Sequence, residues 1–311
     1  MPGRAEVGTV LSGPAVFARA RRRNSLAALW RLIRPLNFIL FLGGVALGGA
    51  LSVGSEVLHP ALLGPLALAM ASAALIGGGS NAINDVFDVD IDRTNRPGRP
   101  LPSGGVSQQS ATAAGIVLVL SGVALAALVS TVHLVIAAGA AVLLTAYNAQ
   151  LKRLPLIGNL VVSVVIAIAI LFGGLTIGFD LNMTVWIGAA FAALTTLGRE
   201  IVKDIEDTRG DLADGARTLP IVTSVETATI VVLAVILAAT AAIPIAATAS
   251  ALGPPFLALG LPAAGLLLGA CWSLLQAPGA LRANCLYAGQ ASRRLKAAMV
   301  LGVLGLFMAT W

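Results

Sequence analysis

Long apolar stretches alternate with short polar segments from residue 33 to the end of this chain. An α-helix needs about 20 predominantly apolar residues to cross a bilayer, and most of these stretches reach that length. The pattern predicts nine transmembrane helices, of which the fourth and the ninth are short. The predicted spans are Ile33–Val53, Pro60–Ala82, Ser110–Thr131, Leu134–Tyr147, Leu156–Phe179, Val185–Ile205, Ala228–Ala249, Pro254–Gln276 and Leu295–Trp311.

The composition of the chain agrees with this pattern. Hydrophobic residues make up 58% of the chain and charged residues 11%, with a mean hydropathy of +0.92. Soluble globular domains carry about 25% charged residues, so this composition excludes a soluble globular protein. The predicted fold class is therefore an all-α integral membrane protein with nine transmembrane helices in a bundle.

The basic residues all fall on one side of the predicted membrane. If the N-terminus is cytoplasmic and nine helices alternate, all 20 Lys and Arg lie in cytoplasmic segments, as the positive-inside rule requires. We therefore expect a basic cytoplasmic arm at residues 1–28 and a nine-helix membrane domain at residues 29–311. The net charge of +6 follows from this arrangement, so we expect the lipid bilayer, and no nucleic acid, as a partner.

The acidic residues gather in two segments with the same D-x-x-D-x-x-x-D spacing, which together hold ten of the 14 Asp and Glu in the chain. At about 100° per residue on an α-helix, aspartates so spaced fall within about 60° of one another. Each motif should therefore form one acidic stripe, with Asp90 and Glu206 pointing away from it. The six aspartates of the two motifs are Asp85, Asp88, Asp92, Asp204, Asp207 and Asp211.

The two motifs also indicate an internal repeat. Each aspartate of the first motif precedes its counterpart in the second by 119 residues, and a similar R-x-L-P tail follows both motifs. The second and sixth predicted helices are then equivalent, and an offset of four spans leaves both halves in the same membrane orientation. We therefore predict a parallel repeat whose acidic faces meet across a central cavity that opens to the cytoplasmic side.

Mg²⁺ is the cofactor that these motifs favour. A carboxylate inside a membrane costs roughly 2.5–3.5 kcal/mol on insertion scales, and carboxylates that face one another repel unless cations lie between them. Mg²⁺ prefers carboxylate oxygens and commonly shares its ligand shell with substrate phosphates. Acids balanced by neighbouring arginines would explain one motif but not two with the same spacing. A Mg²⁺ transporter is a more remote alternative, because the acids lie at helix ends rather than midway across the membrane.

Polar and basic residues beside the motifs are candidate ligands for a polyphosphate. Asn81 lies on the first acidic face and Asn84 borders it. The loop that follows is rich in proline and glycine, which predicts an ordered cap with little secondary structure. Its Arg96 and Arg99 can form forked hydrogen bonds with phosphate oxygens. Lys152 adds a further cation from the next cytoplasmic loop.

Two segments of the chain resemble the UbiA superfamily of intramembrane prenyltransferases. The sequence N-D-V-F-D-V-D-I-D from Asn84 to Asp92 matches the first motif of the family, and R-P-G-R-P-L-P-S-G follows it. The sequence R-E-I-V-K-D-I-E-D-T-R-G-D from Arg199 to Asp211 matches the second. The R-P-L-N segment that opens the first span, and the tyrosine and lysine at the end of the fourth, agree with the family as well.

The resemblance implies a cavity that is open laterally to lipid and the transfer of a polyprenyl group from an allylic diphosphate to an acceptor. It also implies two Mg²⁺ sites, one for each motif. The predicted metal ligands are Asn84, Asp85, Asp88, Asp92, Asp204, Asp207 and Asp211, and all of these aspartates except Asp85 are also predicted to be catalytic. The predicted substrate-binding residues are Arg34, Asn37, Asn81, Asn84, Arg96, Arg99, Tyr147, Lys152, Lys203 and Arg217.

The second motif is similar to that of the ether-lipid branch of this family, in which a geranylgeranyl group is transferred to geranylgeranylglyceryl phosphate. Such an acceptor carries its own phosphate and would need basic residues to hold it. The alternative is an aromatic acceptor, such as 4-hydroxybenzoate or homogentisate in quinone synthesis, which would need a ring-stacking wall. Aromatic residues make up 5% of the chain and few flank the motifs, so the lipid acceptor is the favoured prediction.

Overall fold

The described part of the chain forms a bundle of helices. The computed structural model describes residues 26–213, 215–249, 252–276 and 281–309, and helices are the only regular secondary structure within these ranges. The predicted all-α class is therefore confirmed.

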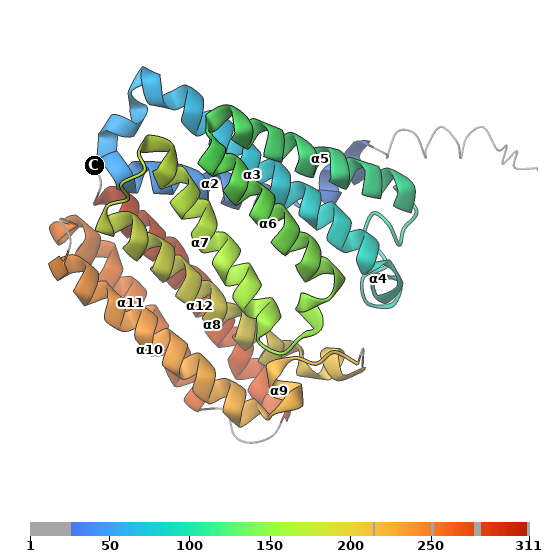
Figure 1. The fold of residues 1–311 in the computed structure, drawn as a ribbon. Helices are drawn as coiled ribbons and strands as arrows, with labels where there is room; N and C mark the ends of the chain where they lie inside the picture. Colours follow the sequence, from blue (N-terminus) through green and yellow to red (C-terminus); the bar gives the residue numbers. More distant parts are fainter. Residues whose placement is uncertain (1–25, 214, 250–251, 277–280, 310–311) are drawn as a thin grey trace, which may run out of the picture.

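The long helices lie side by side, and the short helices α4 and α9 lie at the same end of the bundle (Figure 1). The long helices are α2 (Pro35–Val53), α3 (Pro60–Phe87), α5 (Gln108–Val129), α6 (Thr131–Ala149), α7 (Ile157–Ile177), α8 (Met183–Ala213), α10 (Val225–Ala249), α11 (Gly253–Leu275) and α12 (Leu281–Met308). The short elements are η1 (Gly54–Leu58), α4 (Val89–Asn95), η2 (Leu151–Arg153) and α9 (Leu219–Val222).

Eight helices of the described chain are long and apolar enough to cross a membrane, namely every long helix except α12. The fourth of them, α6, has 19 residues and is longer than the span predicted from Leu134 to Tyr147. Helix α12 contains most of the predicted ninth span but begins at Leu281 rather than Leu295. The charged residues Arg293, Arg294 and Lys296 lie close together within α12, and the count of nine spans stays a prediction.

The two halves of the chain pack in the same order. Within the first half, α2 contacts α3, α3 contacts α5 and α5 contacts α6; within the second, α7 contacts α8, α8 contacts α10 and α10 contacts α11. The two larger buried clusters each draw mainly on one half and include residues of the other. One includes Val45 of α2 and Leu66 of α3 with Phe172 of α7, and the other includes Ile201 of α8 and Ile236 of α10 with Leu47 of α2. This arrangement agrees with the predicted parallel repeat.

Helices α2 and α7 join the two halves at very close range. A Cβ atom added to Gly48 of α2 would lie 1.8 Å from the carbonyl oxygen of Ile170, and one added to Gly173 of α7 would lie 1.9 Å from the carbonyl oxygen of Val45. Only glycine therefore allows the two backbones to touch at these positions, a common device where membrane helices pack. These glycines therefore allow α2 of one half to pack directly against α7 of the other.

The proline- and glycine-rich loop between α4 and α5 forms the ordered cap that its composition predicts. Its Leu101 and Val106 are buried in a small apolar cluster with Leu32, which belongs to a helical segment at residues 26–32. The Arg31 side chain donates a hydrogen bond of 3.0 Å to the carbonyl oxygen of Gly98 in the same loop. The predicted basic arm at residues 1–28 lies outside the described residues except for its last three.

Candidate active site

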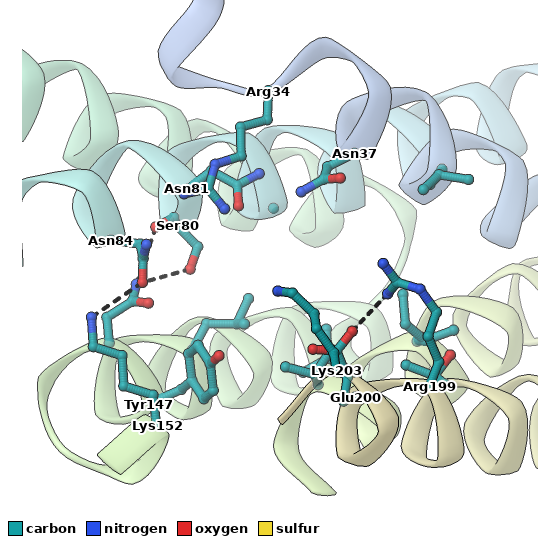
Figure 2. Close-up of a pocket in the computed structure, with 18 of the residues that line it drawn as sticks. Arg34, Asn37, Ser80, Asn81, Asn84, Tyr147, Lys152, Arg199, Glu200 and Lys203 are labelled. Atoms are coloured by element: carbon teal, nitrogen blue, oxygen red, sulfur yellow. Dashed lines mark hydrogen bonds and ion pairs between the residues drawn. The ribbon is translucent and has the colours of Figure 1, made fainter. Parts of the chain in front are cut away.

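A cavity of about 1490 Å³ extends from the α4 end of the bundle toward its middle. Carboxylates, amides and cations line its outer part, and apolar side chains of α2, α7 and α12 line the remainder. In Figure 2, residues of α2 and α3 face residues of α6, η2 and α8 across this cavity. All ten residues predicted to bind substrate line it. They are Arg34, Asn37, Asn81, Asn84, Arg96, Arg99, Tyr147, Lys152, Lys203 and Arg217.

The first acidic motif does not lie on one continuous helix. Helix α3 ends at Phe87, Asp88 has φ −96° and ψ 5°, and α4 begins at Val89. The motif therefore spans two helices rather than the one predicted, although Asp85 and Asp92 still reach the same side chain, that of Arg99. The prediction for Asp90 is confirmed: its side chain is 84% exposed and pairs with Arg93 at 2.7 Å.

Lys152 binds the carboxylate at this break. Its Nζ atom lies 2.5 Å from Oδ1 of Asp88 and 3.3 Å from Oδ1 of Asn84. The amide of Asn84 donates a hydrogen bond of 3.0 Å to the other oxygen of Asp88. Lys152 comes from η2, at the end of α6, so the loop after α6 and the end of α3 are fastened together here. The Lys152 and Asp88 side chains are 14% and 21% exposed, which leaves both accessible from the cavity.

Two arginines hold the other aspartates of the first motif. Arg34 and Arg99 both donate to Oδ1 of Asp85, at 2.6 and 3.4 Å, and Arg99 also donates to Oδ2 of Asp92 at 2.5 Å. Asp92 lines the cavity, whereas Asp85 does not. Asp85 is buried behind the arginines, so the structure turns this predicted metal ligand toward Arg34 and Arg99 rather than toward the cavity.

The second motif lies on the uninterrupted helix α8, as its spacing predicts. Asp207 and Asp211 line the cavity together with Lys203. Asp204 does not, because it accepts a hydrogen bond of 2.8 Å from the Asn159 amide of α7. In each motif, therefore, the first aspartate contacts a side chain from another part of the chain instead of lining the cavity.

Several cavity residues were not assigned a role from the sequence. Glu206 lines the cavity although its place on α8 predicts the opposite side. Arg199 and Glu200 also line it and pair with each other at 2.6 Å. Charged residues inside a membrane helix are costly, so the R-E pair one turn before the second motif was an available signal for a functional site. Asn148 lines the cavity as well, but no charge or spacing distinguishes it in the sequence.

The carboxylates of the cavity are compatible with Mg²⁺ that is shared with a substrate. Within the described residues, no three His, Cys, Asp or Glu side chains come close enough together to hold a metal ion by themselves. Mg²⁺ is commonly held by one or two carboxylates, with phosphate oxygens and water completing its shell. Two aspartates of each motif line the cavity, Asp88 and Asp92 of the first and Asp207 and Asp211 of the second, and Glu200 and Glu206 add further carboxylates from α8. These carboxylate oxygens therefore fit a hard cation that is bound together with a polyphosphate.

The fold and the cavity define a class of protein, the integral membrane proteins whose helices enclose a cavity with both charged and apolar walls. The comparisons with known proteins then give the family. The chain belongs to the UbiA prenyltransferase family, whose sequence profile matches residues 37–297. It is therefore a membrane-embedded prenyltransferase.

Similar proteins include several synthases of one ether lipid. The digeranylgeranylglyceryl phosphate synthase of Methanopyrus kandleri is 38% identical over 285 residues, which cover 92% of this chain and 99% of the relative. That of Methanoculleus marisnigri is 42% identical over 201 residues, 65% of this chain and 70% of the relative. A solved structure from work on digeranylgeranylglyceryl phosphate synthase in membranes is 29% identical with a TM-score of 0.78, covering 92% of this chain and 98% of the other. A UbiA homolog from Archaeoglobus fulgidus bound to GPP and Mg²⁺ has the same fold, with a TM-score of 0.68, 17% identity and coverage of 88% and 99%.

Proposed function

We propose that this prenyltransferase transfers a geranylgeranyl group from its diphosphate to geranylgeranylglyceryl phosphate, in a Mg²⁺-dependent step of ether-lipid synthesis. The reaction would take place in a cavity that opens toward the cytoplasm. The relatives named digeranylgeranylglyceryl phosphate synthase support this acceptor. The positive-inside distribution of Lys and Arg supports the orientation, since the acidic motifs lie on the same side as the basic residues.

The observation that carries the proposal is that the lining of one cavity changes from charged residues in its outer part to apolar residues in its inner part. Its outer part carries cations and carboxylates, including Lys152 and Asp207, whereas its inner part is lined by apolar residues such as Leu47, Ile170 and Val303. A prenyl diphosphate has the same two-part chemistry. Its diphosphate would lie at the outer part and its hydrocarbon chain would extend along the inner part.

The chemistry required of the protein is mainly the control of charge. The bond between C1 of the prenyl group and the diphosphate oxygen breaks, the hydroxyl oxygen of the acceptor bonds to C1, and the products are an ether, diphosphate and a proton. Lys152, Arg96 and Lys203 line the cavity and would hold the oxygens of the leaving diphosphate. Preorganised cations of this kind stabilise charge that develops in the transition state. The apolar inner part would exclude water from the allylic cation.

Residues of both motifs would hold the metal. The proposed metal ligands of the first motif are Asp88, Asp92 and the amide oxygen of Asn84, and those of the second motif are Asp207 and Asp211. All five residues line the cavity. When bound, Mg²⁺ supplies neutralisation of the leaving diphosphate. The Archaeoglobus fulgidus UbiA homolog was solved with GPP and with Mg²⁺, which supports the same pairing of substrate and metal here.

Product identification with purified protein tests the proposal. The protein in lipid nanodiscs would be incubated with radiolabelled geranylgeranyl diphosphate and Mg²⁺, with geranylgeranylglyceryl phosphate or 4-hydroxybenzoate as acceptor. We expect an ether-linked product with geranylgeranylglyceryl phosphate but not with 4-hydroxybenzoate, and no product when EDTA removes Mg²⁺. Product with 4-hydroxybenzoate alone would establish the aromatic acceptor instead.

A further inference from the structure

Asp85 is a buried carboxylate without a direct place in the proposed reaction. Its residue exposure is 3%, and it does not line the cavity although it begins the first acidic motif. A charge buried in this way is tolerated when it is paired and hydrogen-bonded. Both of its cationic partners, Arg34 and Arg99, line the cavity. The carboxylate therefore lies behind two guanidinium groups that face the place where substrate would bind.

Arg34 is held in a backbone conformation that few residues adopt. Its φ is 51° and its ψ is 80°, directly before Pro35 at the start of α2. A non-glycine residue in the left-handed region is strained and persists where surrounding contacts impose it. Here α3 supplies two such contacts: Asp85 binds the Arg34 side chain, and the Asn81 amide donates to the carbonyl oxygen of Ile33 at 3.3 Å. The strained turn aims Arg34 at Asp85 and at the cavity.

Arg99 reaches the same carboxylate from the cap between α4 and α5. It divides its hydrogen bonds between Asp85, which is outside the cavity, and Asp92, which lines it. A divalent cation at Asp92 would compete with Arg99 for that carboxylate, whereas Asp85 would remain its partner. Asp85 is therefore the contact that keeps Arg99 beside Arg34 in either case.

We infer that Asp85 is a positioning residue, which holds Arg34 and Arg99 side by side as a subsite for a phosphate group of a substrate. The inference rests on the proposed function, because that function supplies two phosphate-bearing substrates. The phosphate comes either from the diphosphate of the prenyl donor or from the acceptor. Two guanidinium groups suit either source, since each can form forked hydrogen bonds with phosphate oxygens.

The test compares Asp85→Asn with Arg34→Gln, the double variant and Asp90→Asn in nanodiscs. Asp90→Asn is the matched control, because it removes an exposed carboxylate that also pairs with an arginine in the same motif. Circular dichroism and thermal unfolding would show which variants are folded. The quantities to measure are the KM for each substrate, kcat, the Mg²⁺ concentration for half-maximal rate, and the metal-free affinity for geranylgeranyl S-thiolodiphosphate in EDTA.

We expect Asp85→Asn and Arg34→Gln to raise the KM for one substrate by about tenfold or more, with a smaller change in kcat and an unchanged Mg²⁺ requirement. The double variant should lose less than the two single effects combined, because Asp85 acts partly through Arg34, and any loss beyond that of Arg34→Gln alone reports on Arg99. If the donor supplies the phosphate, its KM rises and the metal-free affinity for the thiolodiphosphate falls. If the acceptor supplies it, the acceptor KM rises alone.

Three results would overturn the inference: an unchanged KM for both substrates, effects that add in the double variant, or a higher Mg²⁺ requirement in Asp85→Asn. The last would make Asp85 a metal ligand, as its sequence motif predicts. Arg34→Gln keeps the test informative if Asp85→Asn does not fold. If the wild-type protein makes no product with the glyceryl phosphate acceptor, the proposed function fails, while thiolodiphosphate binding still tests the subsite against the donor.

Discussion

The two acidic motifs have identical spacing but different surroundings. In the first, the helix breaks at Asp88, and Lys152, Arg34 and Arg99 bind its three aspartates. In the second, all three aspartates lie on the continuous helix α8, and the first of them binds the neutral amide of Asn159. The aspartates of the first motif are thus paired with cations from three other segments of the chain, whereas those of the second motif lie on a single helix. Identical spacing therefore does not fix which carboxylates face the cavity, because the partners of each aspartate decide where it points.

The largest expected effect tests whether both motifs are needed. Asp88→Asn and Asp207→Asn should each lower kcat by on the order of 10²–10³-fold. Each variant removes a carboxylate that would hold Mg²⁺, and the bound Mg²⁺ would neutralise the charge of the leaving diphosphate. Both variants should remain folded by circular dichroism. Near-wild-type turnover of either one would show that its motif does not hold the metal.

A substitution in the glycine contact tests how closely α2 of one half packs against α7 of the other. Gly173→Ala should lower the free energy of unfolding by about 1–3 kcal/mol, because the added methyl group would overlap the α2 backbone. Thermal unfolding in nanodiscs measures this loss. Gly139→Ala on α6 is the control, since a Cβ there has no neighbour within 4 Å. Equal melting temperatures for the two variants would show that the α2 and α7 backbones are not in contact.

Asp204 provides a smaller test of the difference between the motifs. Asp204→Asn should lower kcat/KM by about tenfold or less, because an asparagine oxygen can still accept the hydrogen bond from Asn159, as a neutral rather than a charged acceptor. Steady-state assays alongside Asp207→Asn give the comparison. A loss as large as that of Asp207→Asn would instead restore Asp204 to the metal ligands predicted from the sequence.

The smallest expected effect is that of Asp90→Asn. The Asp90 carboxylate pairs with Arg93 at the surface, and exposed pairs of this kind contribute about 0–1 kcal/mol. Turnover and the melting temperature should therefore match the wild-type protein. A loss of activity comparable to that of Asp88→Asn would mean that the first motif faces the cavity in a different register.

The membrane helices were predictable because the length of an apolar stretch can be determined from that stretch alone, without its neighbours in the fold. The ends predicted for α2 and α7 lie within two residues of those observed. The start of α12 was harder to predict, since its first half carries charged residues and resembles a loop in composition. The cavity residues were predictable as a set, because charged and amide side chains inside a membrane domain are costly and concentrate at functional sites.

The direction of individual carboxylates was not predictable from local spacing. No proline or glycine marks the break at Asp88, whose partner Lys152 lies 64 residues further along the chain. The orientation of Asp85 depends on Arg34, 51 residues earlier, and that of Asp204 on Asn159, 45 residues earlier. These contacts form only when separate helices pack, so they belong to the tertiary structure.

The most direct test is the location of the metal. Crystals grown with Mn²⁺ in place of Mg²⁺, together with geranylgeranyl S-thiolodiphosphate, would show each ion by its anomalous scattering. We predict metal at both motifs, with Asp88 or Asp92 and Asp207 or Asp211 as ligands and diphosphate oxygens shared between them. Asp85 should remain bound to Arg34, without contact to metal. Metal coordinated by Asp85, or confined to one motif, would contradict this arrangement.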